Sequence, residues 1–177
     1  MSERIIHFLS KQHLRVAAIT NDNLFVVLNL FQAYEAEFSS LTQKMPNKEG
    51  VFQLDITPLV DNAGYLLYQN DIPIGFTFID ITKIPYDVEE FYIIPITRGN
   101  GFGKLLAHYI FDMHPGPWQI RQISGANLAR EFWRKTISYY IGEDFKEEIT
   151  EDPKWGEVTR QSFVSRDLVD MTNLSWG

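Results

Sequence analysis

Residues 93–106 read IIPITRGNGFGKLL and carry the clearest pattern in the chain. An apolar run leads into a glycine-rich turn with a cation at each end, Arg98 and Lys104. Apolar residues then recur at helical spacing from 105 to 113, which predicts an amphipathic helix. Such a turn binds anions, because glycines leave the backbone N–H groups open and the helix start adds unpaired donors and a positive dipole. The stretch therefore predicts a phosphate or pyrophosphate site.

Two common phosphate motifs do not fit. A P-loop requires Gly-Lys followed by Ser or Thr, whereas Gly103 and Lys104 are followed by Leu105, so no hydroxyl is offered to magnesium. The dinucleotide fingerprint requires Gly-x-Gly-x-x-Gly. Gly99 and Gly101 supply the first two glycines, but Lys104 stands at the third position. An ordinary glycine turn before a helix remains the simplest alternative for the loop taken alone.

The pattern that fits is Arg98-x-x-Gly101-x-Gly103. It resembles the pyrophosphate loop of the GNAT superfamily, the Gcn5-related N-acetyltransferases. In that family Gln/Arg-x-x-Gly-x-Gly/Ala joins the fourth strand to the third helix and holds the pyrophosphate of acetyl-CoA. A bulky side chain at Gly101 or Gly103 should therefore clash with the bound phosphates.

A second stretch, NLAREFW at residues 127–133, supports the same family. It resembles the signature Asn-x-x-Ala-x-x-Phe-Tyr, whose Asn meets the pantetheine arm. Here Asn127 stands two residues before Ala129 instead of three, and Trp133 replaces the Tyr. The resemblance covers roughly residues 15–165.

The resemblance implies an α/β fold with layered helices and strands. Its mixed, mostly antiparallel sheet has two splayed parallel central strands and helices on both faces. The strand ending at Ile94 and the one starting near Trp118 would form the splayed pair and hold the pantetheine arm. The residues it implies for CoA binding are Tyr92, Ile93, Ile94, Arg98, Gly99, Asn100, Gly101, Phe102, Gly103, Lys104, Asn127 and Phe132.

Periodicity along the chain predicts the same order of elements. A helix should run from Asn21 or Asp22, as its N-cap, to about residue 40. Asn70 and Asp71 predict a hairpin turn. Residues 143–152 form an acidic run before a last strand. The expected strands are 15–20, 64–69, 74–81, 88–94, 118–123 and 155–165, with helices after the glycine loop and around Phe132.

The implied reaction moves an acetyl group from the thioester to a primary amine. An ammonium has no free lone pair, so a base must first remove its proton. Glu90 is the candidate base, and strict strand alternation lets only one of Glu89 and Glu90 face the cleft. Trp133 has no acidic proton for the leaving thiolate, so Tyr139 or Tyr140 is the candidate acid, with Tyr140 preferred. Glu89 and Glu90 are equally compatible with an ordinary charged strand end, and Tyr139 and Tyr140 are more simply explained as core aromatics.

Composition sets further limits. A chain of 177 residues predicts one domain, 1–177, with 166–177 as a mobile tail. No apolar run approaches the ~20 residues needed to span a membrane, and no secretory signal is recognisable. Zero cysteines exclude disulfides and thiolate metal sites, and the four histidines show no metal-ligand spacing. We therefore expect a cytoplasmic protein without a metal.

The net charge of −7 argues against nucleic-acid binding, which needs a basic face. Tyr34, Glu35, Glu37 and the acidic run near Glu147 favour a cationic acceptor. We therefore predict an acetyl-CoA-dependent N-acetyltransferase that acts on a small-molecule or peptide amine, with a homodimer allowed by exposed strand edges. A non-catalytic acyl-CoA-binding module and another kind of phosphate-ligand protein remain as alternatives.

Overall fold

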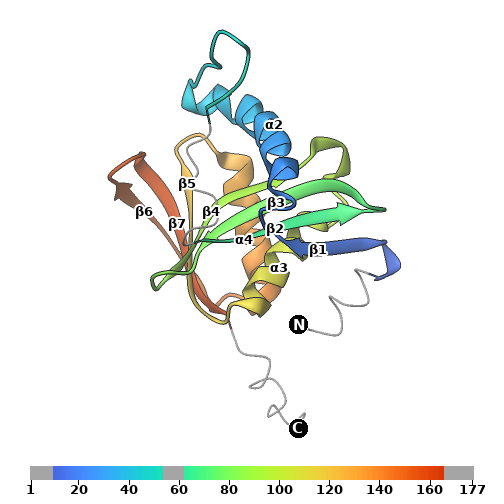
Figure 1. Cartoon of the computed structure of the whole chain (residues 1–177). Helices are drawn as coiled ribbons and strands as arrows, with labels where there is room; N and C mark the ends of the chain where they lie inside the picture. Colours follow the sequence, from blue (N-terminus) through green and yellow to red (C-terminus); the bar gives the residue numbers. More distant parts are fainter. Residues whose placement is uncertain (1–9, 54–61, 166–177) are drawn as a thin grey trace.

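The computed structural model describes residues 10–53 and 62–165 (Figure 1). The tail at 166–177 and most of the segment before the first strand lie outside these ranges. The elements, in order, are β1 (Leu14–Ala18), α2 (Leu24–Thr42), β2 (Asn62–Gln69), β3 (Ile72–Asp80), β4 (Tyr86–Ile93), the 3-10 turn η1 (Pro95–Thr97), α3 (Phe102–Met113), β5 (Gly116–Ile123), α4 (Asn127–Ile141), β6 (Lys146–Asp152) and β7 (Gly156–Ser165).

The strands form one seven-stranded sheet in the order β1-β2-β3-β4-β5-β7-β6. Neighbouring strands are antiparallel except β4 and β5, which are parallel. A helix connects these two, because parallel neighbours need a crossover. The mixed sheet predicted from the sequence is confirmed.

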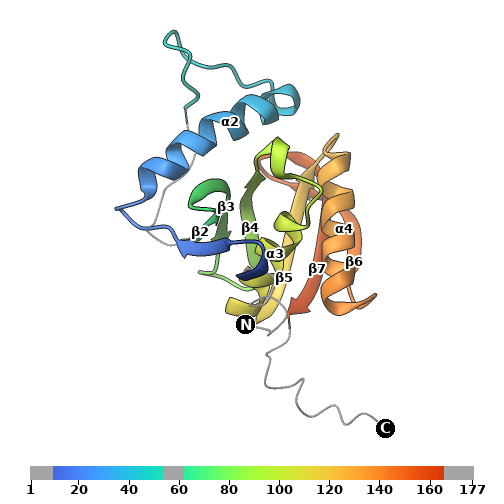
Figure 2. The same ribbon diagram turned by 90° about the vertical axis from the view of Figure 1, so that its right-hand side faces the viewer.

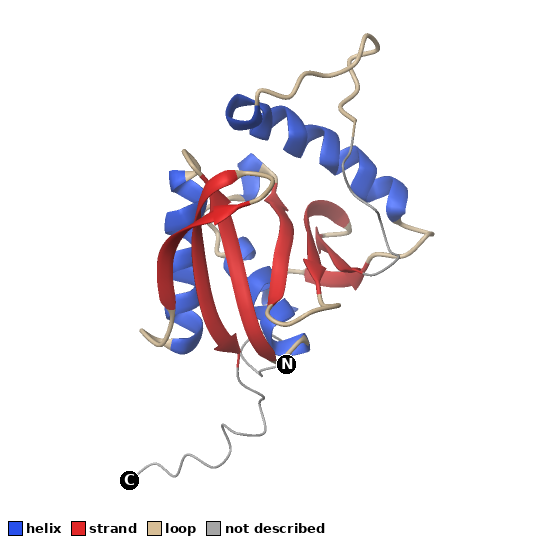
Figure 3. Cartoon of the chain, turned by 90° about the vertical axis from the view of Figure 1, so that its left-hand side faces the viewer, coloured by secondary structure: helices blue, strands red, loops and turns tan. Residues whose placement is uncertain are grey.

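Helices cover both faces of the sheet (Figures 2 and 3). On one face α2 buries Val27 and Phe31 against alternate residues of β2 and β3, such as Leu66 and Phe76. On the other face α3 and α4 form the larger core. Its members include Leu106, Ile110, Phe111, Trp118, Trp133 and Ile137. Alternation along the strands therefore supplies each helix layer with its own apolar surface.

The predicted hairpin between β2 and β3 is present, although β3 begins at Ile72, two residues before its expected start. Asn70 and Asp71 both have positive φ, 49° and 63°, as a two-residue turn of the mirror-image type requires. Because such turns match the right-handed twist of the strands, the local sequence was sufficient to predict this hairpin.

The predicted N-cap of α2 is wrong. The residue before the helix is Asn23, and its side chain makes no capping hydrogen bond. Its Oδ1 instead accepts from Thr20 N–H at 2.8 Å, and its Nδ2 donates to Ala18 O at 2.9 Å. Asn23 therefore fastens the link between β1 and α2.

The acidic run contains a strand that periodicity did not reveal, the edge strand β6. Glu147 accepts hydrogen bonds from Arg130 and Arg134 of α4, and Glu148 accepts one from Arg160 of β7. These charged partners satisfy the carboxylates, so the strand needs no apolar alternation. No helix among the described residues is long and apolar enough to cross a membrane.

Candidate functional site

The parallel strands β4 and β5 separate soon after they meet. They pair only through Tyr86 with Trp118 and Asp87 with Gln119, although each strand has eight residues. Beyond these pairs the facing edges have no strand partner. The predicted splay is confirmed, and it opens a cavity of about 1420 Å³ that is lined by α2, β4, β5, the glycine loop, α4 and the β6–β7 turn.

A buried carboxylate holds the closed end of the splay. Asp87 is 1% exposed, accepts a hydrogen bond from Gln119 Nε2 at 2.9 Å and forms an ion pair with Arg121 at 2.7 Å. Burial raises the pKa of Asp87, while Arg121 opposes the shift. Because both partners lie on β5, this carboxylate joins the strands where the ladder ends.

A bulge in β4 brings Glu90 toward α2. Val88 pairs with Ile79 and Glu90 pairs with Phe78, so Glu89 is the extra residue. The bulge places Glu90 on the α2 face, although Val88 belongs to the opposite core. Both glutamates line the cavity, so the inference from strict alternation was wrong.

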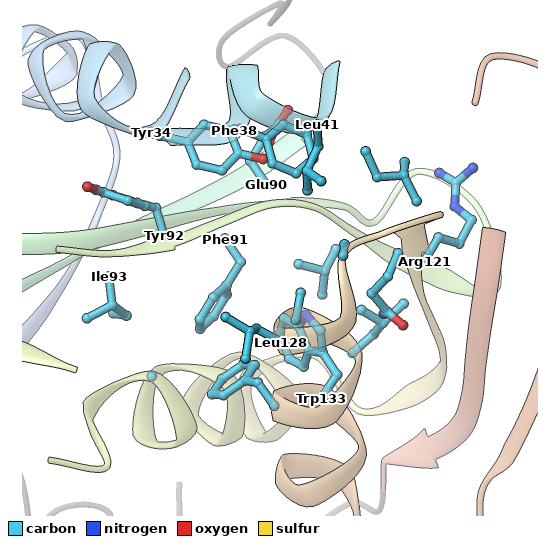
Figure 4. Close-up of a pocket in the computed structure, with 18 of the residues that line it drawn as sticks. Tyr34, Phe38, Leu41, Glu90, Phe91, Tyr92, Ile93, Arg121, Leu128 and Trp133 are labelled. Atoms are coloured by element: carbon cyan, nitrogen blue, oxygen red, sulfur yellow. The ribbon is translucent and has the colours of Figure 1, made fainter. Parts of the chain in front are cut away.

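Glu90 lies half-buried beside Tyr34 of α2 (Figure 4). Burial raises the pKa of Glu90 to about 7. The Tyr34 hydroxyl lowers it, and the carboxylates of Glu35 and Glu89 raise it further. At neutral pH the carboxylate is therefore poised to accept a proton, as a general base requires.

The glycine loop ends in a helix N-terminus without a cap. Gly99 and Gly101 have φ of 82° and 81°, which favour glycine whatever the ligand. Gly101 occupies the N-cap position of α3, with no side-chain capping bond, and Leu105 N–H makes the first helical bond to Gly101 O. The N–H groups of residues 102–104 precede that bond, so they are available to an anion.

The side chain of Arg98 is bound by partners outside the glycine loop. Its two terminal nitrogens donate to both carboxylate oxygens of Glu37 on α2, at 2.7 and 2.9 Å, and its Nε donates to Ile93 O at 2.7 Å. The guanidinium lines the cavity, but its charge is matched by Glu37. It therefore ties α2 to the loop.

Lys104 is the cation that the loop presents. Its Nζ lies 4.2 Å from the centre of the exposed Tyr139 ring, and the side chain lines the cavity. At Gly103 a Cβ would lie 3.2 Å from the Phe132 ring, so glycine also allows α3 and α4 to approach closely. Packing thus explains this glycine independently of any ligand.

The second sequence signature lies in the first half of α4 and packs against β4. Asn127 starts α4 and is exposed, whereas Trp133 is buried against Phe91 of β4, with ring centres 4.8 Å apart. Phe132 also contacts Phe91, at 5.6 Å. All of these residues line the cavity, so the stretch that begins at Asn127 lies beside the splayed strands.

Tyr140 is not at the cavity. Its hydroxyl donates to Asp112 Oδ1 at 2.9 Å, and its ring packs against His108 and Phe111 between α3 and α4. Burial, with Asp112, raises its pKa. Tyr140 therefore loses its predicted role as the acid. Ile94 and Asn100 also lie off the cavity lining, and the Asn100 side chain donates back into its own turn.

The remaining predicted CoA residues line the cavity. From β4 these are Tyr92 and Ile93, and from the loop and α3 they are Arg98, Gly99, Gly101, Phe102, Gly103 and Lys104. The Tyr92 and Phe102 side chains are themselves buried in the two cores. These two residues can therefore contact a ligand through their backbone groups and not through their side chains.

Sequence reasoning missed Gln122 of β5, which also lines the cavity. The side chain is 5% exposed, and neither amide atom has a hydrogen-bond partner in the described part of the chain. Periodicity could have drawn attention to it, because Gln122 follows Trp118 and Ile120 on the buried face of the strand.

Gln122→Met is expected to raise the free energy of unfolding by about 1–3 kcal/mol, since an unpaired buried polar group costs about that much. Gln161→Met is the matched control. Gln161 is fully buried and its Oε1 also lacks a partner among the described residues, but its Nε2 donates to Arg130 O and Glu147 Oε2, so the loss of these two hydrogen bonds should destabilise. Urea unfolding at unchanged m-value measures both. A lower midpoint for Gln122→Met would contradict the assignment.

No cluster of three or more His, Cys, Asp or Glu side chains that could hold a metal occurs among residues 10–53 and 62–165.

The sequence matches no protein-family model and no curated protein. Solved structures, by contrast, share the fold. An acetyltransferase from Thermus thermophilus has a TM-score of 0.61 at 15% identity and covers 85% of this chain and 96% of its own. The ribosomal-protein-S18-alanine N-acetyltransferase from Escherichia coli has a TM-score of 0.59 at 11% identity, covering 92% and 99%. A ribosomal L7/L12 alpha-N-protein acetyltransferase in complex with coenzyme A has a TM-score of 0.55 at 10% identity, covering 85% and 93%.

These structures define the class of fold. The chain has the fold of the GNAT acetyltransferases, as the two sequence signatures predict. TM-scores of 0.55–0.61 establish the fold, whereas sequence identities of 10–15% leave the activity to be argued from the site.

Proposed function

We propose that this protein is an N-acetyltransferase that moves an acetyl group from acetyl-CoA directly to a primary amine of a small molecule or peptide. The observation that carries the proposal is the splay of β4 from β5 beside the uncapped N-terminus of α3. An extended thioester arm fits between two strand edges that lack partners, and its pyrophosphate fits the helix N-terminus. One structure of the same fold holds coenzyme A.

In this proposal the loop binds the pyrophosphate through backbone N–H groups from Gly99 to Lys104, with charge from the Lys104 side chain. Asn127 and Phe132 on α4 flank the arm. Arg98 contributes by fixing the loop to α2 through Glu37. The protein thus holds the donor mainly with backbone groups that its fold leaves unpaired.

Glu90 takes a proton from the acceptor ammonium, directly or through a water, and the free amine attacks the thioester carbon. The C–N bond forms, the nitrogen gives up its second proton to water, the C–S bond breaks, and the coenzyme leaves as a thiolate. Trp133 has no acidic proton and Tyr140 lies elsewhere, whereas Tyr139 lines the cavity, so the thiolate takes its proton from Tyr139 or from water. The net reaction converts ammonium and thioester into amide, thiol and one proton.

A non-catalytic acyl-CoA-binding module is the second candidate. Trp133 stands where the family signature has a Tyr, and it is buried against Phe91. This position therefore provides no phenol that could protonate the leaving thiolate. Such a module would use the same loop and splay but would not turn over any amine.

Calorimetry with CoA, followed by a free-thiol assay with acetyl-CoA and a panel of amines, separates the candidates. We expect CoA to bind and free thiol to rise above background hydrolysis only when an amine is present. Binding without any amine-dependent thiol would favour the module. Absence of CoA binding would contradict both. The predicted cytoplasmic location and homodimer remain proposals.

A further inference from the structure

One wall of the cavity is an apolar stripe on α2. Tyr34, Phe38 and Leu41 recur at intervals of about one helical turn and all line the cavity beside Glu90 (Figure 4). The Tyr34 and Phe38 rings are stacked, with centres 5.5 Å apart and planes at 13°. Leu41 remains 40% exposed. The stripe therefore offers apolar surface to a ligand near Glu90.

Trp155 adds a second aromatic surface. It lies in the turn between β6 and β7, lines the same cavity and is 44% exposed. Asp152 Oδ1 accepts from the backbone N–H groups of Lys154 and Trp155, at 2.8 and 3.0 Å. Arg121 of β5 in turn pairs with Asp152. The turn that carries the indole is thus anchored to the sheet.

Several carboxylates at the cavity are held in ion pairs. Glu35 pairs with Lys44 at 2.8 Å, Glu37 pairs with Arg98, and Arg121 bridges Asp87 and Asp152. Glu147 of the acidic run lies off the cavity lining. Paired carboxylates attract a second cation weakly, because their fields largely cancel.

Glu90 differs from these carboxylates. Within residues 10–53 and 62–165 Glu90 forms no ion pair; the Tyr34 hydroxyl contacts it, and the charge of Lys154 acts on it from a greater distance. A ligand with one ammonium group can therefore pair with the carboxylate of Glu90. For a ligand with two or three ammonium groups the cavity lining offers Glu89 as one further carboxylate, while Lys104, Lys135 and Lys154 on the same lining repel the additional positive charges.

Resting on the acetyltransferase function above, we propose that the acceptor is an aryl-alkyl monoamine. Its ring lies on the Phe38–Leu41 stripe and near Trp155, and its amine reaches Glu90. Burying one aromatic side chain contributes about 1.5–3 kcal/mol, which corresponds to a preference of about tenfold or more in kcat/KM.

The test compares 2-phenylethylamine with spermidine and with a short peptide bearing a free N-terminus, using acetyl-CoA and free-thiol release. We expect kcat/KM to be at least about tenfold higher for 2-phenylethylamine. Phe38→Ala should raise KM for that amine about tenfold, while Phe25→Ala should not change it. Phe25 lies on the same helix, is 63% exposed and lies off the cavity lining.

Calorimetry of each amine with the CoA-saturated protein supplies a readout besides turnover. If spermidine or the peptide is the better substrate, the proposed acceptor class is overturned and the acetyltransferase function stands. If nothing is acetylated but 2-phenylethylamine alone binds, and Phe38→Ala weakens it, the monoamine site stands and the acetyl transfer falls. If 2-phenylethylamine neither binds nor reacts, the acceptor class is overturned.

Discussion

Glu90→Gln is expected to lower kcat by about 10²–10⁴, the usual contribution of a positioned general base. The wild-type pH profile of kcat should show an inflection near pH 7, where Glu90 titrates, with activity falling below it as the carboxylate takes up a proton. The variant should lack this inflection. Stopped-flow or steady-state thiol release from pH 5.5 to 9 measures both effects.

The folded protein should tolerate this change. The folded-state pKa of Glu90 is raised, so its contribution to stability is fully present below the unfolded value and is lost as pH rises through about 7. At pH 8 wild type carries a half-buried charge that Glu90→Gln lacks. The variant should therefore unfold at an equal or higher urea concentration at that pH.

Glu89→Gln is the matched control for Glu90→Gln. Glu89 is the exposed residue of the bulge and lines the same cavity. We expect a change of less than about tenfold in kcat, because Glu89 lies off the α2 face where Tyr34 meets Glu90. A larger loss of kcat for Glu89→Gln than for Glu90→Gln would indicate that Glu89, not Glu90, is the general base.

The parts of this site that local sequence could predict are those set by local chemistry. Residues 99–103 include two glycines with positive φ and the start of a helix. Both features depend on residues that are adjacent in the sequence, so the sequence could predict them. The two-residue turn at Asn70 and Asp71 is similar. The strand order followed from the resemblance, because antiparallel and parallel neighbours look alike in a single sequence.

The parts that failed depend on contacts between distant segments. The bulge at Glu89 arises from pairing with β3, and no single residue type signals it. Arg98 pairs with Glu37, which is 61 residues away in the chain, so its charge was assigned to the ligand. The sequence favoured Tyr140 over Tyr139 as the acid. The orientation of α4, which depends on tertiary packing, instead places the Tyr140 hydroxyl beside Asp112.

Lys104→Glu is expected to weaken CoA binding by about thirtyfold or more. Lys104 carries the charge of the loop that no ion pair in the described chain neutralises, and it stands at the third position of α3. Two unit charges at ~4 Å interact by about 1 kcal/mol in water and more near a protein surface, and reversing the sign doubles the change. About 2 kcal/mol corresponds to this loss in affinity.

The same substitution should not harm the helix, since a carboxylate in the first turn is favoured by the helix dipole and the capping arrangement. A stable fold with weak CoA binding is therefore the distinctive result. Lys11→Glu makes an equal change in net charge at an exposed residue off the cavity lining, so it should leave affinity unchanged.

Calorimetry at low and high salt completes the test. The loss for Lys104→Glu should shrink as ionic strength rises, because salt screens the phosphate–side-chain interaction. Arg98→Ala should cost less than Lys104→Glu, because its guanidinium is already bound by Glu37. If Lys104→Glu folds normally and binds CoA as wild type does, the N-terminus of α3 is not where the pyrophosphate lies.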